Sequence, residues 1–181
     1  LTYTGNNSEG VTSLSIPDYV ENLDILASLT SLESLDLKNA NKLTSVNLSG
    51  NTSIRKVDLE NNTSITTLDL SGSSVRFVTA RESNLTGINL ENCTSLEQLD
   101  CSSSEGIGNL RTLNLKGCSA LKLLVCTGNK LLTLDVNADE HPALENIECF
   151  GQSLAIEELS NDIDTSKPEL NLYDLISGND S

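Results

Sequence analysis

The sequence predicts a solenoid, which is a tube of short parallel β-strands stacked coil upon coil. Two observations predict it. A six-residue apolar motif recurs along most of the 181-residue chain, and successive copies start 10 to 14 residues apart. The chain also has two Phe, three Tyr and no Trp, so its core has to be built from aliphatic side chains. Repeats of this kind are stable only when neighbours stack and bury a continuous core.

The motif has apolar residues at its first, fourth and sixth positions. The last two are two residues apart, the period that places side chains on one side of a strand. Each copy therefore predicts one short strand, and two copies make one coil of about 21 or 22 residues. The eleven copies are Leu32-Leu35-Leu37, Leu43-Val46-Leu48, Ile54-Val57-Leu59, Ile65-Leu68-Leu70, Val75-Val78-Ala80, Leu85-Ile88-Leu90, Leu96-Leu99-Cys101, Leu110-Leu113-Leu115, Leu121-Leu124-Cys126, Leu131-Leu134-Val136 and Leu144-Ile147-Cys149.

Alternate copies form two series, and each series predicts a parallel sheet on one side of the tube. Series A strands end at Leu37, Leu59, Ala80, Cys101, Cys126 and Cys149, with Ile16 one coil earlier, and series B strands end at Leu48, Leu70, Leu90, Leu115 and Val136. An Asn often follows three or four residues after the strand, at Asn41, Asn51, Asn62, Asn84 and Asn129. We expect these Asn side chains to point inward and satisfy backbone groups of adjacent coils.

We expect one domain over residues 1–181. It has an N-terminal cap and irregular first coil over 1–31, repeats over 32–154, and a C-terminal cap and tail over 155–181, where the motif is lost. Within the first coil, residues 17–31 predict either a short helix with Pro17 near its first turn or an irregular strand at Leu23 and Ile25. Two insertions, Ser102–Asn109 and Asn137–Ala143, predict surface loops, and the first either borders a binding surface or is simply tolerated.

The charge of the chain disfavours several partners. Eleven Lys and Arg against 26 Asp and Glu give a net charge of −15, which opposes binding to nucleic acid and to anionic membranes. No stretch approaches the roughly 20 apolar residues of a membrane span, so we expect no membrane insertion. The chain starts at Leu1 without an initiator Met or a signal peptide, which indicates a processed chain whose targeting segment is absent.

No motif predicts catalysis, a cofactor or a metal site. The sequence has no Walker loop, dinucleotide fingerprint, H-E-x-x-H or C-x-x-C. The one His, His141, lies beside Asp139 and Glu140, and we expect it in a solvated loop. An Asp recurs between the last two apolar positions, which leaves calcium open but favours a solvated row. These residues are Asp36, Asp58, Asp69, Asp100 and Asp135.

The five Cys fall on the repeat. Cys101, Cys126 and Cys149 are expected to stack inside the series A sheet as a ladder of thiols. Cys93 and Cys118 are expected at the Asn-like turn position of series B. Buried free thiols are favoured over disulfides, because parallel side chains in register point the same way and give poor bond geometry.

The segments LSGNTSI, LEQLDCSSS and LKLLVCTGNKLLTLDV resemble the leucine-rich repeats of bacterial surface proteins. They are most similar to the internalin branch in which a Cys replaces a Leu in a repeat of about 21 residues. The resemblance covers roughly residues 11–155. It implies a leucine-rich-repeat solenoid whose parallel strands form a curved right-handed superhelix with little helix. It also implies a recognition module on a bacterial cell surface or in a secreted protein.

The outward positions of series A differ from the small, polar positions of series B. Both Phe residues and five of the eleven basic residues fall on series A, and exposed aromatic and Arg side chains are typical of binding hot spots. The predicted binding face consists of Arg55, Lys56, Arg76, Phe77, Arg81, Gln98, Lys122, Leu123, Val125 and Phe150. We expect it to bind a protein or glycan without catalysis. The alternatives are a structural spacer or surface-layer component, or a face covered by a neighbouring domain, the tail or a second copy.

Overall fold

The computed structural model of the protein describes residues 10–104 and 107–152. The predicted C-terminal cap and tail over 155–181, and residues 1–9 of the N-terminal cap, lie outside the described residues. The elements are β1 (Ser13–Ser15), η2 (Asp24–Ser28), β2 (Ser34–Asp36), β3 (Ser45–Asn47), β4 (Lys56–Asp58), β5 (Thr67–Asp69), β6 (Phe77–Thr79), β7 (Gly87–Asn89), β8 (Gln98–Asp100), β9 (Thr112–Asn114), β10 (Leu123–Val125) and β11 (Asn146–Glu148).

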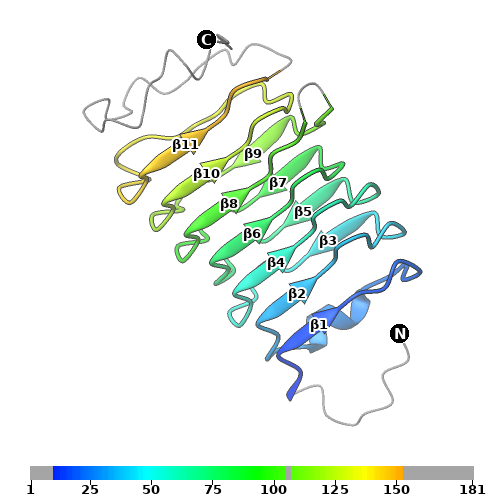
Figure 1. The fold of residues 1–181 in the computed structure, drawn as a ribbon. Helices are drawn as coiled ribbons and strands as arrows, with labels where there is room; N and C mark the ends of the chain where they lie inside the picture. Colours follow the sequence, from blue (N-terminus) through cyan, green and yellow to red (C-terminus); the bar gives the residue numbers. More distant parts are fainter. Residues whose placement is uncertain (1–9, 105–106, 153–181) are drawn as a thin grey trace.

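The strands form two parallel sheets, as the two series predict. Series A gives a seven-stranded sheet in the order β1-β2-β4-β6-β8-β10-β11, and series B gives a four-stranded sheet in the order β3-β5-β7-β9. Each strand pairs with the strand one coil away, so equivalent residues of successive coils lie in register, as Leu35 does with Val57. Figure 1 shows the coils stacked along one axis, with β1 and β11 near opposite ends.

The core is one continuous apolar cluster between the two sheets. The inward positions are occupied by Leu, Ile and Val, and residues such as Leu35, Val57 and Leu99 have no exposed surface. The thiols of Cys101, Cys126 and Cys149 lie buried in this cluster at the ends of successive series A strands, which confirms the predicted ladder. Desolvation by burial raises the pKa of the Cys101 thiol to about 12. The sulfur therefore packs as a small apolar group.

The first coil matches one of the two forms predicted for residues 17–31, a short helix, but not the predicted start near Pro17. It contains a 3-10 helix, η2, that begins seven residues after Pro17, and no strand forms at Leu23. The reason is the spacing of Leu26 and Leu29, which are three residues apart and both buried. A 3-10 helix has three residues per turn and places both on the core side. The N–H of Leu26 donates to Leu23 O at 2.9 Å, and the N–H of Leu29 donates to Leu26 O at 3.1 Å.

The last series B copy also differs from the prediction. Leu131-Leu134-Val136 forms only an isolated bridge at Leu134 rather than a three-residue strand. All three side chains are nevertheless buried. The apolar pattern thus fixes which side chains enter the core, while the local backbone pairing is weaker here.

The recurring Asp residues have a structural role at the turns. The Oδ1 atom of Asp58 accepts a hydrogen bond from the N–H of Glu60, two residues later, at 3.2 Å. The same bond is made by Asp36, Asp69, Asp100, Asn47, Asn89 and Asn114. This Asx turn begins the bend that follows each of these strands. It accounts for Asp36, Asp58, Asp69 and Asp100 without calcium, and Asp58 itself is buried rather than solvated. Asp135 is exposed, as predicted.

The predicted inward Asn side chains are only partly correct. Asn62 and Asn129 are buried and donate to carbonyl oxygens of their own and the preceding coil, such as Leu37 O and Cys101 O. Asn41, however, is exposed, and its amide oxygen accepts from the next coil at the surface. Asn41 and Asn84 follow the strand end by four residues, whereas Asn62 and Asn129 follow it by three. Asn51 also follows by three, but it is half-buried and its amide oxygen accepts from Ser53 N–H and Ile54 N–H. Only the three-residue spacing turns the side chain into the tube.

Candidate binding face

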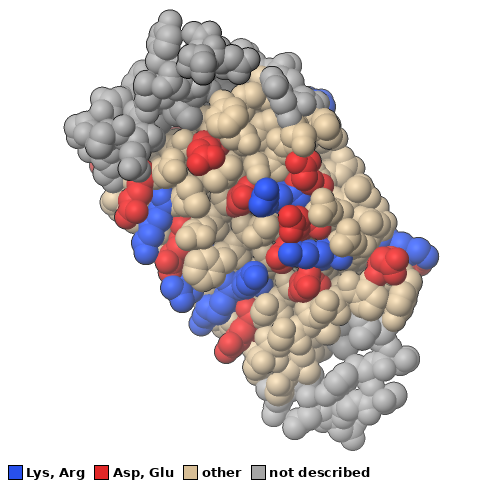
Figure 2. Space-filling view, in the orientation of Figure 1, with Lys and Arg blue, Asp and Glu red and all other residues tan. Residues whose placement is uncertain are grey.

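The outward surface of the seven-stranded sheet, which we call the series A face, presents its side chains in rows across successive coils. The charged row stands just before the strands and consists of Glu33, Arg55, Arg76, Glu97, Lys122 and Glu145, whose backbones are joined by hydrogen bonds from coil to coil. The central row consists of Ser34, Lys56, Phe77, Gln98, Leu123 and Asn146, paired in register. In the view of Figure 2, basic and acidic side chains are interspersed over the stacked coils.

Three neighbours in the charged row form an ion cluster. The Arg76 Nε donates to Glu97 Oε1 at 2.7 Å, and the Lys122 Nζ donates to Glu97 Oε2 at 3.1 Å. These two hydrogen bonds hold the pKa of the Glu97 carboxyl below its usual value. Two cations share one carboxylate, so the cluster has one positive charge left over. Exposed ion pairs contribute little stability, so the consequence of the cluster is to fix where that charge lies.

Arg76 also lies over an aromatic ring. Its guanidinium carbon is 5.2 Å from the centroid of the half-buried Phe77 ring. This cation–π contact and the bond to Glu97 restrict the guanidinium from two sides. Phe77, Gln98 and Leu123 lie side by side on β6, β8 and β10, so the amide of Gln98 separates two apolar side chains. Val125 follows Leu123 on the same strand, and both are half-buried.

Four of the predicted face residues are not part of this group, although two of them, Arg55 and Lys56, lie at the adjacent strand β4, where Lys56 pairs in register with Phe77. Phe150 is 51% exposed, but it follows β11, and two strands of the sheet stand between β11 and Phe77 on β6. The Nε of Arg81 is 3.6 Å from Asp100, at the other end of the strands. The Arg55 guanidinium donates to three carbonyl oxygens of nearby turns, and Lys56 is exposed. The compact group is therefore Arg76, Phe77, Gln98, Lys122, Leu123 and Val125.

Sequence reasoning missed two ionic groups on this face. Glu97 joins Arg76 to Lys122. It precedes β8, which lies between β6 and β10, and it has the same position relative to its strand as Arg76 and Lys122 have to theirs. Alignment of the coils was the signal that could have identified it. A second cluster joins Lys38 to Glu60 at 3.0 Å and to Asp58 at 3.3 Å. These contacts, first that with Glu60, raise the pKa of the Lys38 amine.

Glu82 anchors Ser103 and Ser104, at the start of the insertion Ser102–Asn109, next to the series A sheet. The carboxylate of Glu82 accepts from the Ser104 hydroxyl at 2.8 Å, from the Ser104 N–H at 3.0 Å and from the Ser103 hydroxyl at 3.2 Å. The Ser104 hydroxyl makes the largest contribution to lowering the pKa of Glu82. Glu82 has a positive φ of 50°, which places its side chain toward the loop.

The prediction for His141 was wrong. It is buried, with 3% of its surface exposed, and its Nε2 lies 3.0 Å from Leu115 O. Because a carbonyl oxygen only accepts, Nε2 carries the hydrogen. The signal was present in the spacing: His141 precedes Leu144 by three residues, as Cys93 precedes Leu96 and Cys118 precedes Leu121. The equivalence was missed because His141 lies within the insertion Asn137–Ala143, which was treated as a surface loop.

Neither metal ligation nor a membrane span is seen in the described part of the chain. Within residues 10–104 and 107–152, no group of three or more His, Cys, Asp or Glu side chains is placed to hold a metal ion. Over the same residues, no helix has the length and apolarity needed to cross a bilayer.

No protein-family model and no curated protein matches the chain. Several solved structures are similar to it, including the following two. One is the functional domain of InlJ from Listeria monocytogenes, which includes a cysteine ladder, at 16% identity over 82% of this chain and 55% of that one, with a TM-score of 0.24. The other is the APL1 leucine-rich repeat domain, at 23% identity over 81% of this chain and 48% of that one, with a TM-score of 0.23.

The chain spans about half the length of each of these two structures. The predicted leucine-rich-repeat solenoid is confirmed by the motif, the two in-register parallel sheets and the continuous core. A fold alone identifies neither a function nor a ligand.

Proposed function

We propose that the protein is a non-enzymatic recognition module that binds a protein or glycan through the series A face. The observation that carries the proposal is the position of the Arg76 guanidinium, held between the Phe77 ring and the Glu97 carboxylate. An Arg fixed in this way loses little side-chain entropy when a ligand binds. Arg and aromatic side chains are also the residues most often found in binding hot spots.

The chemistry of the group suggests the kind of ligand. Arg76 and Lys122 share Glu97, and the remaining positive charge lies beside the apolar surface of Phe77 and Leu123. A ligand that presents a carboxylate next to an apolar group complements both features. Such groups occur on proteins and on acidic glycans. The sequence resemblance to bacterial surface repeats supports a place at a bacterial cell surface or in a secreted protein.

A matched pair of variants tests the proposal. The double variant Phe77→Ala and Leu123→Ala removes the apolar part of the series A face, and Thr67→Ala with Thr112→Ala makes a similar change on the series B sheet. Each protein is screened on a glycan array and on an array of host extracellular proteins. We expect hits that disappear in the first variant and persist in the second, with unchanged thermal unfolding of both.

A further variant isolates the charge. Glu97→Gln removes the negative charge that Arg76 and Lys122 share but keeps a side-chain oxygen that can accept from Arg76, so the affinity for an acidic hit should rise severalfold. Hits that survive the Phe77→Ala and Leu123→Ala double variant would contradict the proposed face. Two empty arrays with well-folded protein would favour a structural spacer or surface-layer component instead.

A further inference from the structure

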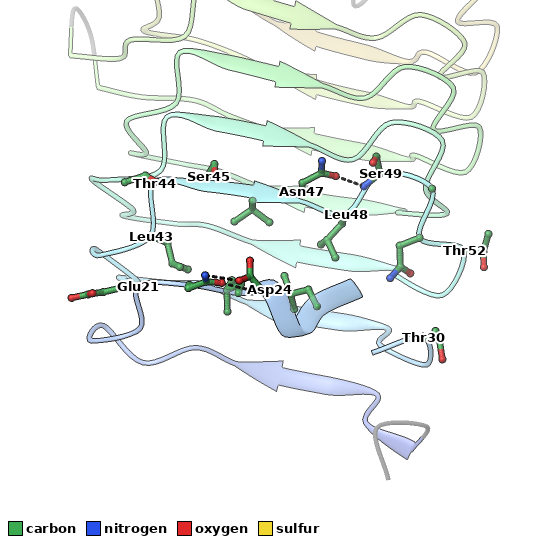
Figure 3. A pocket seen from close by; sticks show the side chains of 16 residues that line it. Glu21, Asp24, Thr30, Leu43, Thr44, Ser45, Asn47, Leu48, Ser49 and Thr52 are labelled. Atoms are coloured by element: carbon green, nitrogen blue, oxygen red, sulfur yellow. Dashed lines mark hydrogen bonds between the residues drawn. The ribbon is translucent and has the colours of Figure 1, made fainter. Parts of the chain in front are cut away.

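The four-stranded sheet has an open edge at its N-terminal end. Its first strand is β3, because the first coil contains the short helix η2 where a series B strand would stand. A cavity of about 840 Å³ lies at this edge, lined by residues of the η2 region and of the segment 43–52. Figure 3 shows η2 on one side of this space and β3 on the other.

Residues of β3 and its flanks line the cavity. The equivalent residues of later coils show which backbone groups of β3 would bond to a preceding strand. The carbonyl oxygens of Asp69, Asn89 and Asn114 each accept an N–H from the preceding coil. Asn47 holds the same position in β3. The N–H groups of Gly87 and Thr112 likewise donate to the preceding coil. Ser45 holds their position.

The same comparison holds at both ends of the strand. Thr66 N–H donates to Thr44 O of the preceding coil, and Ser71 O accepts from Gly50 N–H of that coil. Thr44 N–H and Ser49 O are the corresponding groups one coil earlier, and both residues line the cavity. Among the described residues no strand lies on that side of β3. Two N–H groups and two carbonyl oxygens are therefore arranged for a strand that the chain's described part does not supply there.

The side chains around the cavity indicate what this strand would carry. Leu26, Leu43, Val46 and Leu48 supply apolar surface. Glu21 and Asp24 are the charged residues of the lining, which contains no Lys or Arg. Lys42 is 3.5 Å from Glu21 and neutralises that carboxylate. The Asp24 carboxylate instead accepts from the Asn22 amide nitrogen, and the Asp24 N–H donates to the Asn22 amide oxygen. The lining is thus mainly polar, with apolar side chains among the polar ones and a negative charge at the Asp24 end.

We propose that the β3 edge binds an extended peptide of another protein as a fifth strand, parallel to β3. The peptide donates to Asn47 O and Ser49 O, and its carbonyl groups accept from Thr44 N–H and Ser45 N–H. Alternate residues are apolar, as in every series B strand, and a Lys or Arg reaches Asp24. Strand addition of this kind takes its affinity from main-chain hydrogen bonds and its specificity from alternate side chains. This surface is separate from the series A face.

The test uses a fluorescein-labelled peptide of alternating threonine and valine with a lysine at each end, with binding followed by fluorescence anisotropy. Ser45→Pro removes the N–H at the open edge and leaves the β3–β5 pairing groups in place, since proline is tolerated on the open side of an edge strand. Ser45→Ala keeps the N–H and is the matched control. We expect Ser45→Pro to weaken binding about tenfold or more and Ser45→Ala less than about twofold.

Two further measurements do not depend on the folding of the proline variant. A peptide that is N-methylated on alternate residues should not bind the wild-type chain, and Asp24→Asn should weaken binding of the lysine-ended peptide but not of a glutamate-ended one. Equal binding of methylated and unmethylated peptides would overturn strand addition. Equal binding to Ser45→Pro and Ser45→Ala would also overturn it. A dimer of the unliganded chain that Ser45→Pro dissociates, measured by sedimentation, would assign the edge to a second copy instead.

Discussion

The Nε2 of His141 donates to the carbonyl oxygen of Leu115 at 3.0 Å. One coil earlier, Cys118 has the equivalent position. The Cys118 sulfur lies 3.2 Å from Leu90 O, and the Cys93 sulfur lies 2.9 Å from Leu70 O. Three successive turns of series B thus use two thiols and one imidazole for the same hydrogen bond. In each case a buried side chain donates to a carbonyl of the coil before it, which also accepts the backbone N–H of the residue three positions later.

Replacement of His141 should therefore destabilise the fold. His141→Ala removes the donor and leaves a cavity, so we expect a loss of about 2–4 kcal/mol in the free energy of unfolding, measured by urea denaturation. His141→Gln restores an amide nitrogen near the position of Nε2 and should lose less. The neighbouring exposed residue provides the control, because Asp139→Ala should change stability by less than about 0.5 kcal/mol. An unchanged urea midpoint in His141→Ala would contradict the structural role.

Asn62 should be far more sensitive than Asn41. Asn62 is fully buried, donates to Leu37 O and Ala40 O at 3.2 Å, and accepts from Ile65 N–H at 2.9 Å. Asn62→Ala leaves the Ile65 N–H unpaired and removes the second hydrogen bond of Leu37 O and of Ala40 O, so we expect a loss of about 2–4 kcal/mol. Asn41→Ala affects exposed bonds and should lose less than about 1 kcal/mol. Similar losses in the two variants, compared by thermal unfolding, would show that the three-residue spacing has no special role.

Alanine substitutions at Gly128 and Gly50 distinguish the cost of backbone strain from the cost of steric crowding. Both have positive φ, 71° and 68° respectively. A Cβ added at Gly128 would lie 1.9 Å from Ser103 O, whereas one at Gly50 meets nothing within 4 Å. Gly50→Ala should therefore cost about 1 kcal/mol for the strained φ, and Gly128→Ala at least twice as much. Chemical denaturation of the two variants checks this, and equal losses would mean that the loop at Ser103 moves freely.

The buried thiols should make the protein sensitive to alkali. Burial raises the pKa of both Cys101 and Cys118 from 9.0 to about 12. The folded thiols keep their protons while the unfolded thiols ionise, so their contribution to stability is complete below pH 9 and is lost as the pH rises toward 12. The loss is on the order of 1 kcal/mol per pH unit for each thiol.

A comparison of two proteins isolates this effect. Between pH 8 and pH 10, wild type should lose more unfolding free energy than the double variant Cys101→Ala and Cys118→Ala. Native protein at pH 8 should also react slowly with a thiol reagent, because the thiolate is the reactive form. Parallel pH profiles of the two proteins would contradict the raised pKa values.

The repeat made the sheets predictable, while its interruptions hid most of what was missed. Apolar spacing fixes the inward side of each strand, so the positions of Leu35 or Cys126 follow from counting. His141 was misplaced because an insertion separates it from its strand, and η2 formed because Leu26 and Leu29 match a 3-10 helix. The Arg76–Glu97–Lys122 cluster depends on register between strands, which a linear pattern contains only after the coils are aligned. Which outward residues touch depends on how many strands separate them, and two strands lie between those of Phe77 and Phe150.

The positive charge left over on the Arg76 and Lys122 pair lies on a chain whose net charge is −15. At physiological salt the Debye length is about 8 Å, and beyond it an approaching acidic ligand is screened from the local positive charge and from the net negative charge. At low salt the ligand first meets the repulsion of the whole molecule. The attraction is felt only on close approach. Encounter and retention are therefore opposed: added salt should speed the association of an acidic ligand while it also speeds its release.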